Sequence, residues 1–166
     1  RIHKSIKPIW EETFSKWPAT TFLLVHARSA FRDEGIEIEN NMPFSDNRYV
    51  FIFNGELQGV RIKEDGRIGA EKIFNYIKRF DKGDVLQALQ KGTDIIQKKT
   101  RYIRAMNIIL TDFERTFLCT HYNEDPAYFA MHQTRKNGTY MLSSQPYPGE
   151  TDWQQIENNT TKEIIE

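Results

Sequence analysis

The sequence is short of three things that would each have indicated a class of function. It has a single cysteine, Cys119, which excludes an internal disulfide and fits a reducing compartment, so we expect a cytoplasmic protein. Its longest apolar runs, such as Tyr49 to Phe53, are too short to cross a bilayer. Its 23 basic residues balance 23 acidic ones without long blocks of one sign, which disfavours binding to nucleic acid or to an anionic membrane.

Metal-ligand spacing is absent as well. None of the histidines, His3, His26, His121 and His132, stands in an HxxxH or HExxH pattern or beside cysteines at finger spacing. The sequence therefore predicts no metal site, and it implies no cofactor.

Cys119 and His121 form the one pair that could suggest a nucleophile. They are two residues apart on an expected strand, so both side chains point to the same face. Neighbouring strand residues point outward side by side, however, without the convergence that a catalytic pair needs. A buried, inert Cys119 is the favoured interpretation.

Hydrophobic residues make up 39% of the 166 residues, enough for one core, so we expect a single domain over residues 1–166. Pro8 and the spacing of apolar residues in "IWEETFSKW" predict a short amphipathic helix over 9–17. The apolar, β-branched "TTFLLVHA" predicts a central strand over 20–27, covered on both faces. A long polar loop is expected from Phe31 to Asn47.

The second half of the sequence changes from helical to strand patterns. "AEKIFNYIKRF" and "DVLQALQKGTDIIQKK" carry apolar residues at helical spacing and predict two successive helices. Strands are then expected in "MNIILTD", "RTFLCTHY", "AYFAMHQ" and "TYMLSSQ", with Asn137-Gly138 as a hairpin turn. Strands, two helices and more strands indicate an α+β layered domain.

Two short stretches are candidate functional sites with competing interpretations. Arg28 ends the expected strand over 20–27, where its guanidinium could bind a carboxylate or form an ordinary surface ion pair. Asn54-Gly55 is a favoured pair for a hairpin turn. An asparagine amide and a glycine N–H can also converge on one oxygen as an oxyanion hole.

Taken together, five stretches resemble the class II glutamine amidotransferase domain, nearest its small amidohydrolase-like branch. They are "LLVHARSA", "ENNMPF", "YVFIFNGEL", "GRIGAEKIF" and "YMLSSQPY", followed by Trp153 and Ile156. The resemblance runs from about Pro8 to Ile164. It implies the fold of N-terminal-nucleophile hydrolases, a four-layer αββα sandwich of two antiparallel sheets, here without its first hairpin.

The resemblance also implies a site. Arg28 would bind the α-carboxylate of glutamine, and Asn54 with Gly55 would form the oxyanion hole. An N-terminal cysteine would attack the side-chain amide and form a γ-glutamyl thioester that water cleaves. That cysteine is not among these residues, so we expect it upstream and expect the 166 residues alone to be inactive.

Several positions depart from the family pattern. Gly69-Ala70-Glu71 stands where an aspartate of the family binds the substrate ammonium, and Asp65 or Glu71 is the candidate replacement. A glutamate at a helix start is also a common capping residue. Met42 and Phe53 replace family histidines, and Ser144-Gln145-Pro146 replaces "SEP". The missing ionic anchor is expected to weaken the binding of free glutamine, so the expected substrate is either glutamine or another γ-glutamyl compound.

Two hypotheses remain open at this stage. One is a cysteine-dependent amidohydrolase or glutaminase that acts on a small-molecule amide, with a synthetase partner or a homo-oligomer also possible. The other is a non-catalytic ligand-binding or regulatory module that keeps the same fold and Arg28.

Overall fold

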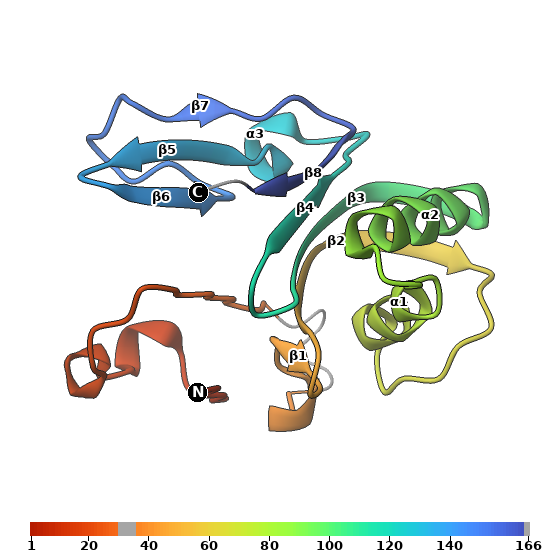
Figure 1. The fold of residues 1–166 in the computed structure, drawn as a ribbon, viewed down its shortest axis with the longest axis horizontal. Coiled ribbons are helices and arrows are strands. Elements are labelled where there is room, and N and C mark those ends of the chain that lie inside the picture. Colours follow the sequence, from red (N-terminus) through yellow and green to blue (C-terminus); the bar gives the residue numbers. More distant parts are fainter. Residues whose placement is uncertain (30–35, 165–166) are drawn as a thin grey trace.

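The computed structural model describes residues 1–29 and 36–164 (Figure 1). Its elements, in chain order, are the 3₁₀ helices η1 (Ile9–Glu11), η2 (Phe14–Lys16) and η4 (Ile38–Asn40), then β1 (Phe44–Ser45), β2 (Val50–Val60), α1 (Gly69–Lys78), α2 (Val85–Lys98), β3 (Thr100–Thr111), β4 (Thr116–Thr120), α3 (Pro126–Phe129), β5 (His132–Lys136), β6 (Thr139–Ser143), β7 (Gln154–Gln155) and β8 (Thr160–Ile164).

Two antiparallel sheets form the body of the fold. The larger has the strand order β1-β2-β3-β4-β8, and the smaller has the order β6-β5-β7. The α+β class with two antiparallel sheets is confirmed, and it is a sandwich-type arrangement.

Helices α1 and α2 cover one face of the larger sheet (Figure 1). Their apolar sides pack on alternate residues of β2 to β4, and Phe51 stacks on Phe74 of α1 with ring centroids 5.1 Å apart. The opposite face carries Leu118, which packs with Met131 and Ile156 beside the smaller sheet. The larger sheet is therefore the central layer between two helices and a second sheet.

The predicted pair of helices and most of the later strands are confirmed. Asn137 and Gly138 both have positive φ, 51° and 76°, as a two-residue hairpin turn between β5 and β6 requires. One strand prediction is wrong in part, because "AYFAMHQ" begins with the last residues of α3 and becomes a strand only at His132. Pro126 starts that turn, as proline favours the first position of a helix.

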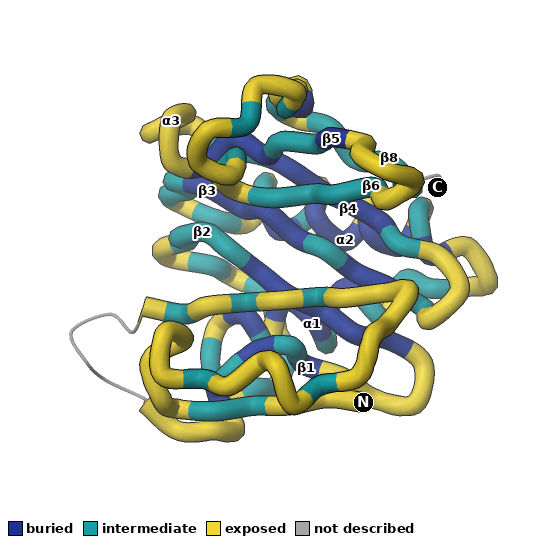
Figure 2. Tube along the Cα trace, turned by 90° about the vertical axis from the view of Figure 1, so that its left-hand side faces the viewer, coloured by how far each residue is buried: buried dark blue, intermediate teal, exposed yellow. Residues whose placement is uncertain are grey.

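The helix and the strand predicted within the first 29 residues are wrong. The expected helix over 9–17 is two separate 3₁₀ turns, η1 and η2, with no buried residue. The expected central strand over 20–27 is extended but belongs to neither sheet, and Leu23 is 76% exposed. Figure 2 shows this segment as mostly exposed, in contrast to the buried strands of the larger sheet. Apolar content indicated burial here, but no neighbouring strand among the described residues provides it.

The loop expected from Phe31 to Asn47 lies partly outside the described residues, as does Ala30 of "HARSA". Its described part contains η4 and the short strand β1.

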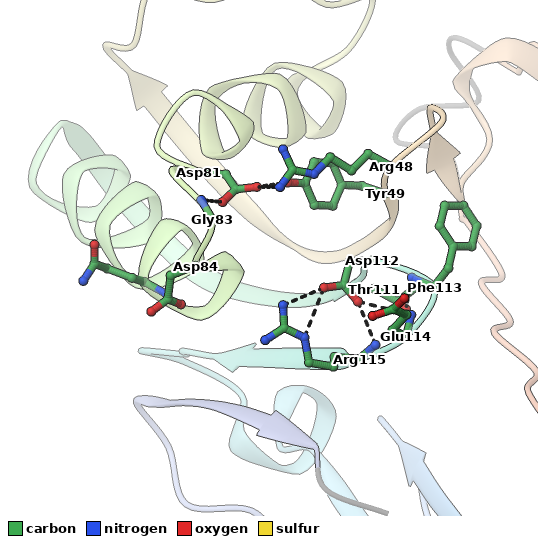
Figure 3. Close-up of polar contacts among 11 residues, drawn as sticks. Arg48, Tyr49, Asp81, Gly83, Asp84, Thr111, Asp112, Phe113, Glu114 and Arg115 are labelled. Carbon is green, nitrogen blue, oxygen red and sulfur yellow. Dashed lines mark hydrogen bonds and ion pairs between the residues drawn. The ribbon is translucent and has the colours of Figure 1, made fainter.

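The turn before β2 is fixed to the connection between α1 and α2 (Figure 3). The Tyr49 hydroxyl donates to the carboxylate of Asp81, which also accepts from the Gly83 N–H at 2.7 Å and pairs with Arg48 at 2.7 Å. Asp46 accepts the N–H groups of Arg48 and Tyr49, both at 2.9 Å. These contacts fix where β2 begins and hence where Asn54 lies.

Candidate functional site

Asn54 and Gly55 lie in the middle of β2 and not in a turn. Asn54 pairs with Asn107 of β3 and Gly55 pairs with Met106, and the strand continues to Val60 after an irregularity between Glu56 and Leu57. The hairpin-turn interpretation of this dipeptide is therefore wrong. The pair is a fixed part of the central sheet.

The backbone N–H of Gly55 points away from β3. The Met106 N–H donates to the carbonyl of His121 at 2.7 Å, on the β4 side of β3. Opposed residues in an antiparallel ladder exchange both hydrogen bonds or neither, so Gly55 and Met106 are a non-hydrogen-bonded pair. The Gly55 N–H consequently faces the edge of β2 that is opposite β3.

Gly55 also has a packing role that sequence reasoning missed. A Cβ at this position would lie 2.1 Å from the carbonyl oxygen of Ala105, far inside van der Waals contact. Only glycine allows β2 and β3 to approach this closely. The residue is required by the sheet, whatever its use to a ligand.

Asn54 lies on the sheet face opposite α1 and α2. Directly opposed residues of two strands share a face, so Asn54 lies on the side of Asn107. The Asn107 amide donates to the carbonyl of Phe129 at 2.7 Å and accepts from the Thr120 hydroxyl at 2.8 Å. Asn107 and Thr120 are buried. Asn107 is the one asparagine in the largely apolar "MNIILTD", and this was the sequence signal for a buried polar residue here.

His26 brings the Arg28 segment to the candidate oxyanion hole. Its Nε2–H donates to the carbonyl of Phe53, the residue before Asn54, at 3.1 Å. A carbonyl only accepts, so the proton is on Nε2, and the buried Nδ1 has no hydrogen-bond partner in the described structure. Burial lowers the pKa of His26, the bond to Phe53 opposes this, and the Arg28 charge adds to the lowering. The ring is thus neutral at pH 7.

Arg28 follows His26 by two residues in the same extended segment. Exposure alternates along 23–29, where Leu24, His26 and Arg28 are half-buried and the residues between them are exposed. Arg28 and His26 therefore share the inward side of the segment. His26 and Phe53 are 27 residues apart in the sequence. Their hydrogen bond brings the stretch that contains Arg28 to the strand that contains Asn54-Gly55.

Met42 contacts the backbone N–H of Phe53, which lies at the same edge of β2 as the Phe53 carbonyl. Its Sδ accepts the Phe53 N–H at 3.1 Å, while His26 takes the Phe53 carbonyl. Met42 and Phe53 are the two positions where the sequence departs from family histidines, and here they contact each other. The edge of β2 is thus closed at Phe53, and Gly55 is the next residue along it whose N–H faces outward.

Glu71 is engaged by Arg67. Its carboxylate accepts the Arg67 backbone N–H at 2.6 Å and the guanidinium at 2.5 Å, at the start of α1. The Arg67 hydrogen bond holds the pKa of Glu71 below its ordinary value, although burial opposes this. The geometry is that of a residue stabilising the helix start.

Cys119 is buried on the helix side of the sheet, within the core cluster beneath α2. Burial raises the pKa of its thiol, the opposite of what a nucleophile needs. His121 instead contacts the Asn159 side chain, with 2.5 Å between Nδ1 and Oδ1. Both observations support the interpretation of Cys119 as a small core residue.

Among residues 1–29 and 36–164, no cluster of three or more His, Cys, Asp or Glu side chains is placed to hold a metal ion. None of the helices there combines the length and the apolar character that a bilayer crossing requires.

The arrangement of a central antiparallel sheet, with helices on one face and a second sheet on the other, is similar to that of two solved structures. The chain superimposes on a glutamine aminotransferase class-II domain protein from Silicibacter pomeroyi with a TM-score of 0.53 and 13% identity, over 77% of this chain and 71% of that one. It also superimposes on a structure from Pseudomonas aeruginosa described as a predicted glutamine amidotransferase, with a TM-score of 0.50 and 16% identity.

The second superposition covers 76% of this chain and 62% of the other, so the chain spans less than two thirds of that protein. No protein-family model and no curated protein matches the sequence. At these identities the likeness shows the fold, and that fold is the one the sequence motifs indicated.

Proposed function

We propose that this chain forms the substrate-binding and oxyanion-stabilising part of a cysteine-dependent amidohydrolase of the glutamine amidotransferase type. The observation that carries the proposal is the hydrogen bond from His26 to the Phe53 carbonyl. It joins the segment with the candidate carboxylate anchor, Arg28, to the candidate oxyanion hole, Asn54 and Gly55. Two interpretations that were ambiguous separately support each other once they meet in space.

The chemistry would be ordinary acyl transfer. A thiolate attacks the amide carbonyl, and the oxygen takes up negative charge that the Gly55 N–H and the Asn54 amide stabilise. The C–N bond then breaks, the nitrogen leaves as ammonia or an amine after gaining a proton, and water cleaves the thioester to a carboxylate. The nucleophile would be an N-terminal cysteine outside these residues, because Cys119 is buried in the core.

Arg28 would define one end of the substrate. A guanidinium suits bidentate capture of a carboxylate, such as the α-carboxylate of a γ-glutamyl group. Gly69, at the position expected to bind the substrate ammonium, has no charged side chain. Glu71 would bind that ammonium only if its ion pair with Arg67 opened. γ-Glutamyl amides are therefore proposed as the substrate class, with glutamine as its simplest member.

A second candidate is a non-catalytic ligand-binding module, and one observation favours it. Gly55 is required by its contact with Ala105, so its presence alone needs no catalytic explanation. Asn54 is therefore the residue whose substitution distinguishes the two functions, because the close approach of β2 and β3 requires Gly55 and not the Asn54 side chain.

The test uses the complete protein that contains this chain. Asn54→Ala should lower the release of ammonia or glutamate from glutamine and γ-glutamyl amides by about a hundredfold or more, since it removes an oxyanion donor. Alkylation of an upstream cysteine should abolish the release. Asn75→Ala is the matched control, because Asn75 lies on α1 and donates to the Asp65 carbonyl.

A loss of turnover under about threefold in folded Asn54→Ala would remove the oxyanion role. A complete protein that binds glutamine without any turnover would establish the binding module instead.

A further inference from the structure

The contacts at Phe53 assign a role to a residue outside the proposed anchor and oxyanion hole. Phe53 is the residue immediately before Asn54-Gly55, and both of its backbone groups at the outer edge of β2 are taken by side chains. The N–H is held by Met42 of the same sheet region, and the carbonyl is held by His26 of the separate extended segment. Of these two bonds, the one from His26 joins different parts of the chain.

The bond from His26 attaches a segment that lies outside both sheets. Residues 20–29 belong to neither sheet, and Phe22, Leu23 and Val25 are 48%, 76% and 54% exposed. Leu24 packs against the core cluster, and His26 adds a directional hydrogen bond. Packing alone fixes a segment less sharply than packing with a hydrogen bond, because the hydrophobic effect is non-directional.

Resting on the proposed function, we propose that His26 is the positioning residue that sets the distance between the carboxylate anchor and the oxyanion hole. Arg28 lies on the same side of the segment as His26, two residues on. Gly55 lies two residues beyond Phe53 on the same edge. The bond between His26 and Phe53 holds this segment against the edge of β2 that carries the Gly55 N–H, and so sets where the Arg28 backbone lies relative to that edge.

The bond has a specific chemical requirement. His26 must present an N–H at the Nε2 position, which the neutral Nε2–H form of the ring supplies. A glutamine side chain places its own amide N–H at a similar distance from the backbone and can donate to the same carbonyl. A phenylalanine fills the volume of the ring but has no donor. The two substitutions separate the hydrogen bond from the packing.

The first measurement is the binding of L-glutamine to the chain of residues 1–166 by calorimetry. His26→Phe should weaken binding by about tenfold or more, and His26→Gln should restore it to within about threefold, as expected when one buried hydrogen bond positions a charged anchor. Phe22→Ala is the control, because Phe22 lies in the same segment as His26 and is 48% exposed, and it should leave binding within about threefold.

The second measurement does not depend on binding and so separates this inference from the proposed function. Nitrogen-15 NMR of the imidazole should show the neutral Nε2–H tautomer, and His26→Phe should shift both the Arg28 Nε and the Gly55 amide signals while His26→Gln keeps them near their original positions. Absence of glutamine binding by the unsubstituted chain would count against the proposed substrate and leave this measurement to decide the role of His26.

Three results would overturn the role of His26: an Nδ1–H tautomer, unchanged Arg28 and Gly55 signals in His26→Phe, or a His26→Gln variant as impaired as His26→Phe. Thermal unfolding of each variant confirms that the comparison is made between folded proteins.

Discussion

Residues 20–27 and residues 49–53 have similar amino-acid composition, but the first segment is mostly exposed and the second is buried. "TTFLLVHA" and "YVFIF" are both apolar, aromatic and β-branched. Phe51 of the second is fully buried between β3 and α1, whereas Leu23 of the first is 76% exposed. The difference lies in their neighbours, because a strand is stabilised only when another strand takes its backbone hydrogen bonds.

The comparison also separates the two halves of the candidate site. Asn54 and Gly55 are half-buried residues of β2 that pair with β3, and Phe53 just before them is held by Met42 and His26. Arg28 is on the less supported segment. The candidate oxyanion hole is therefore part of a paired strand, whereas the candidate carboxylate anchor lies on a segment outside both sheets.

Hydrogen exchange gives the largest expected contrast. Backbone amides of residues 22–27 should exchange at least about a thousandfold faster than those of β2 near Phe51, because the sheet must open before its amides exchange. Exchange followed by NMR or mass spectrometry measures both regions in one sample. Equal protection in the two regions would mean that the extended segment is paired in solution.

A matched pair of phenylalanines tests the same contrast in stability. Phe51→Ala should lower the free energy of unfolding by about 3–5 kcal/mol, since it leaves a cavity in the core. Phe22→Ala, at a residue that is 48% exposed, should cost about 0.5 kcal/mol or less. Urea denaturation provides both values, and similar costs would contradict the difference in burial.

A matched pair of glycines tests how tightly β2 and β3 approach. Gly55→Ala should destabilise by about 1–3 kcal/mol, because the new Cβ meets the Ala105 carbonyl. Gly69→Ala, at the start of α1 with nothing within 4 Å of its Cβ, should be neutral or stabilise by up to about 1 kcal/mol. The same denaturation curves measure both, and a tolerated Gly55→Ala would show that the two strands can separate locally.

The pH dependence of Asp81 gives the smallest expected effect. Burial opposes ionisation of Asp81, but hydrogen bonds from Tyr49 and Gly83 and the Arg48 charge outweigh it and lower its pKa. A lowered pKa means that this stabilisation is complete above the ordinary carboxyl pKa of about 4 and is lost as the pH falls through the folded value.

Asp81→Asn should therefore reduce the loss of stability between about pH 4 and pH 2 by about 1 kcal/mol, measured by urea denaturation at several pH values. An unchanged pH dependence would show that the contact drawn in Figure 3 adds little to the attachment of β2.

Much of the later fold could be predicted because its signals are local. α1 and α2 follow from helical spacing, and Asp84 caps α2 by accepting the Gln87 N–H at 2.9 Å. The turn at Asn137-Gly138 follows from the positive φ that both residues tolerate. These features depend on residues within a few positions of one another, so the sequence contains them directly.

The candidate site was predictable only in part, because its geometry is not local. The motif order indicated Arg28, Asn54 and Gly55 as candidates. The pair is chemically suited to a turn, and the sequence opposed that interpretation only through the weak strand character of the following "ELQGVRI". Its position follows from the pairing of β2 with β3, whose partners are about fifty residues away.

Sequence patterns were enough to predict the α+β class, the helices α1 and α2, and the later hairpin. The order of the motifs was enough to indicate an amidotransferase-type fold. Only the tertiary structure showed that residues 20–27 lie outside both sheets, that the Gly55 N–H faces away from β3, and that His26 contacts Phe53. The physical reason is that burial and hydrogen-bond direction depend on which distant segment lies alongside, and a strand sequence does not specify its neighbour.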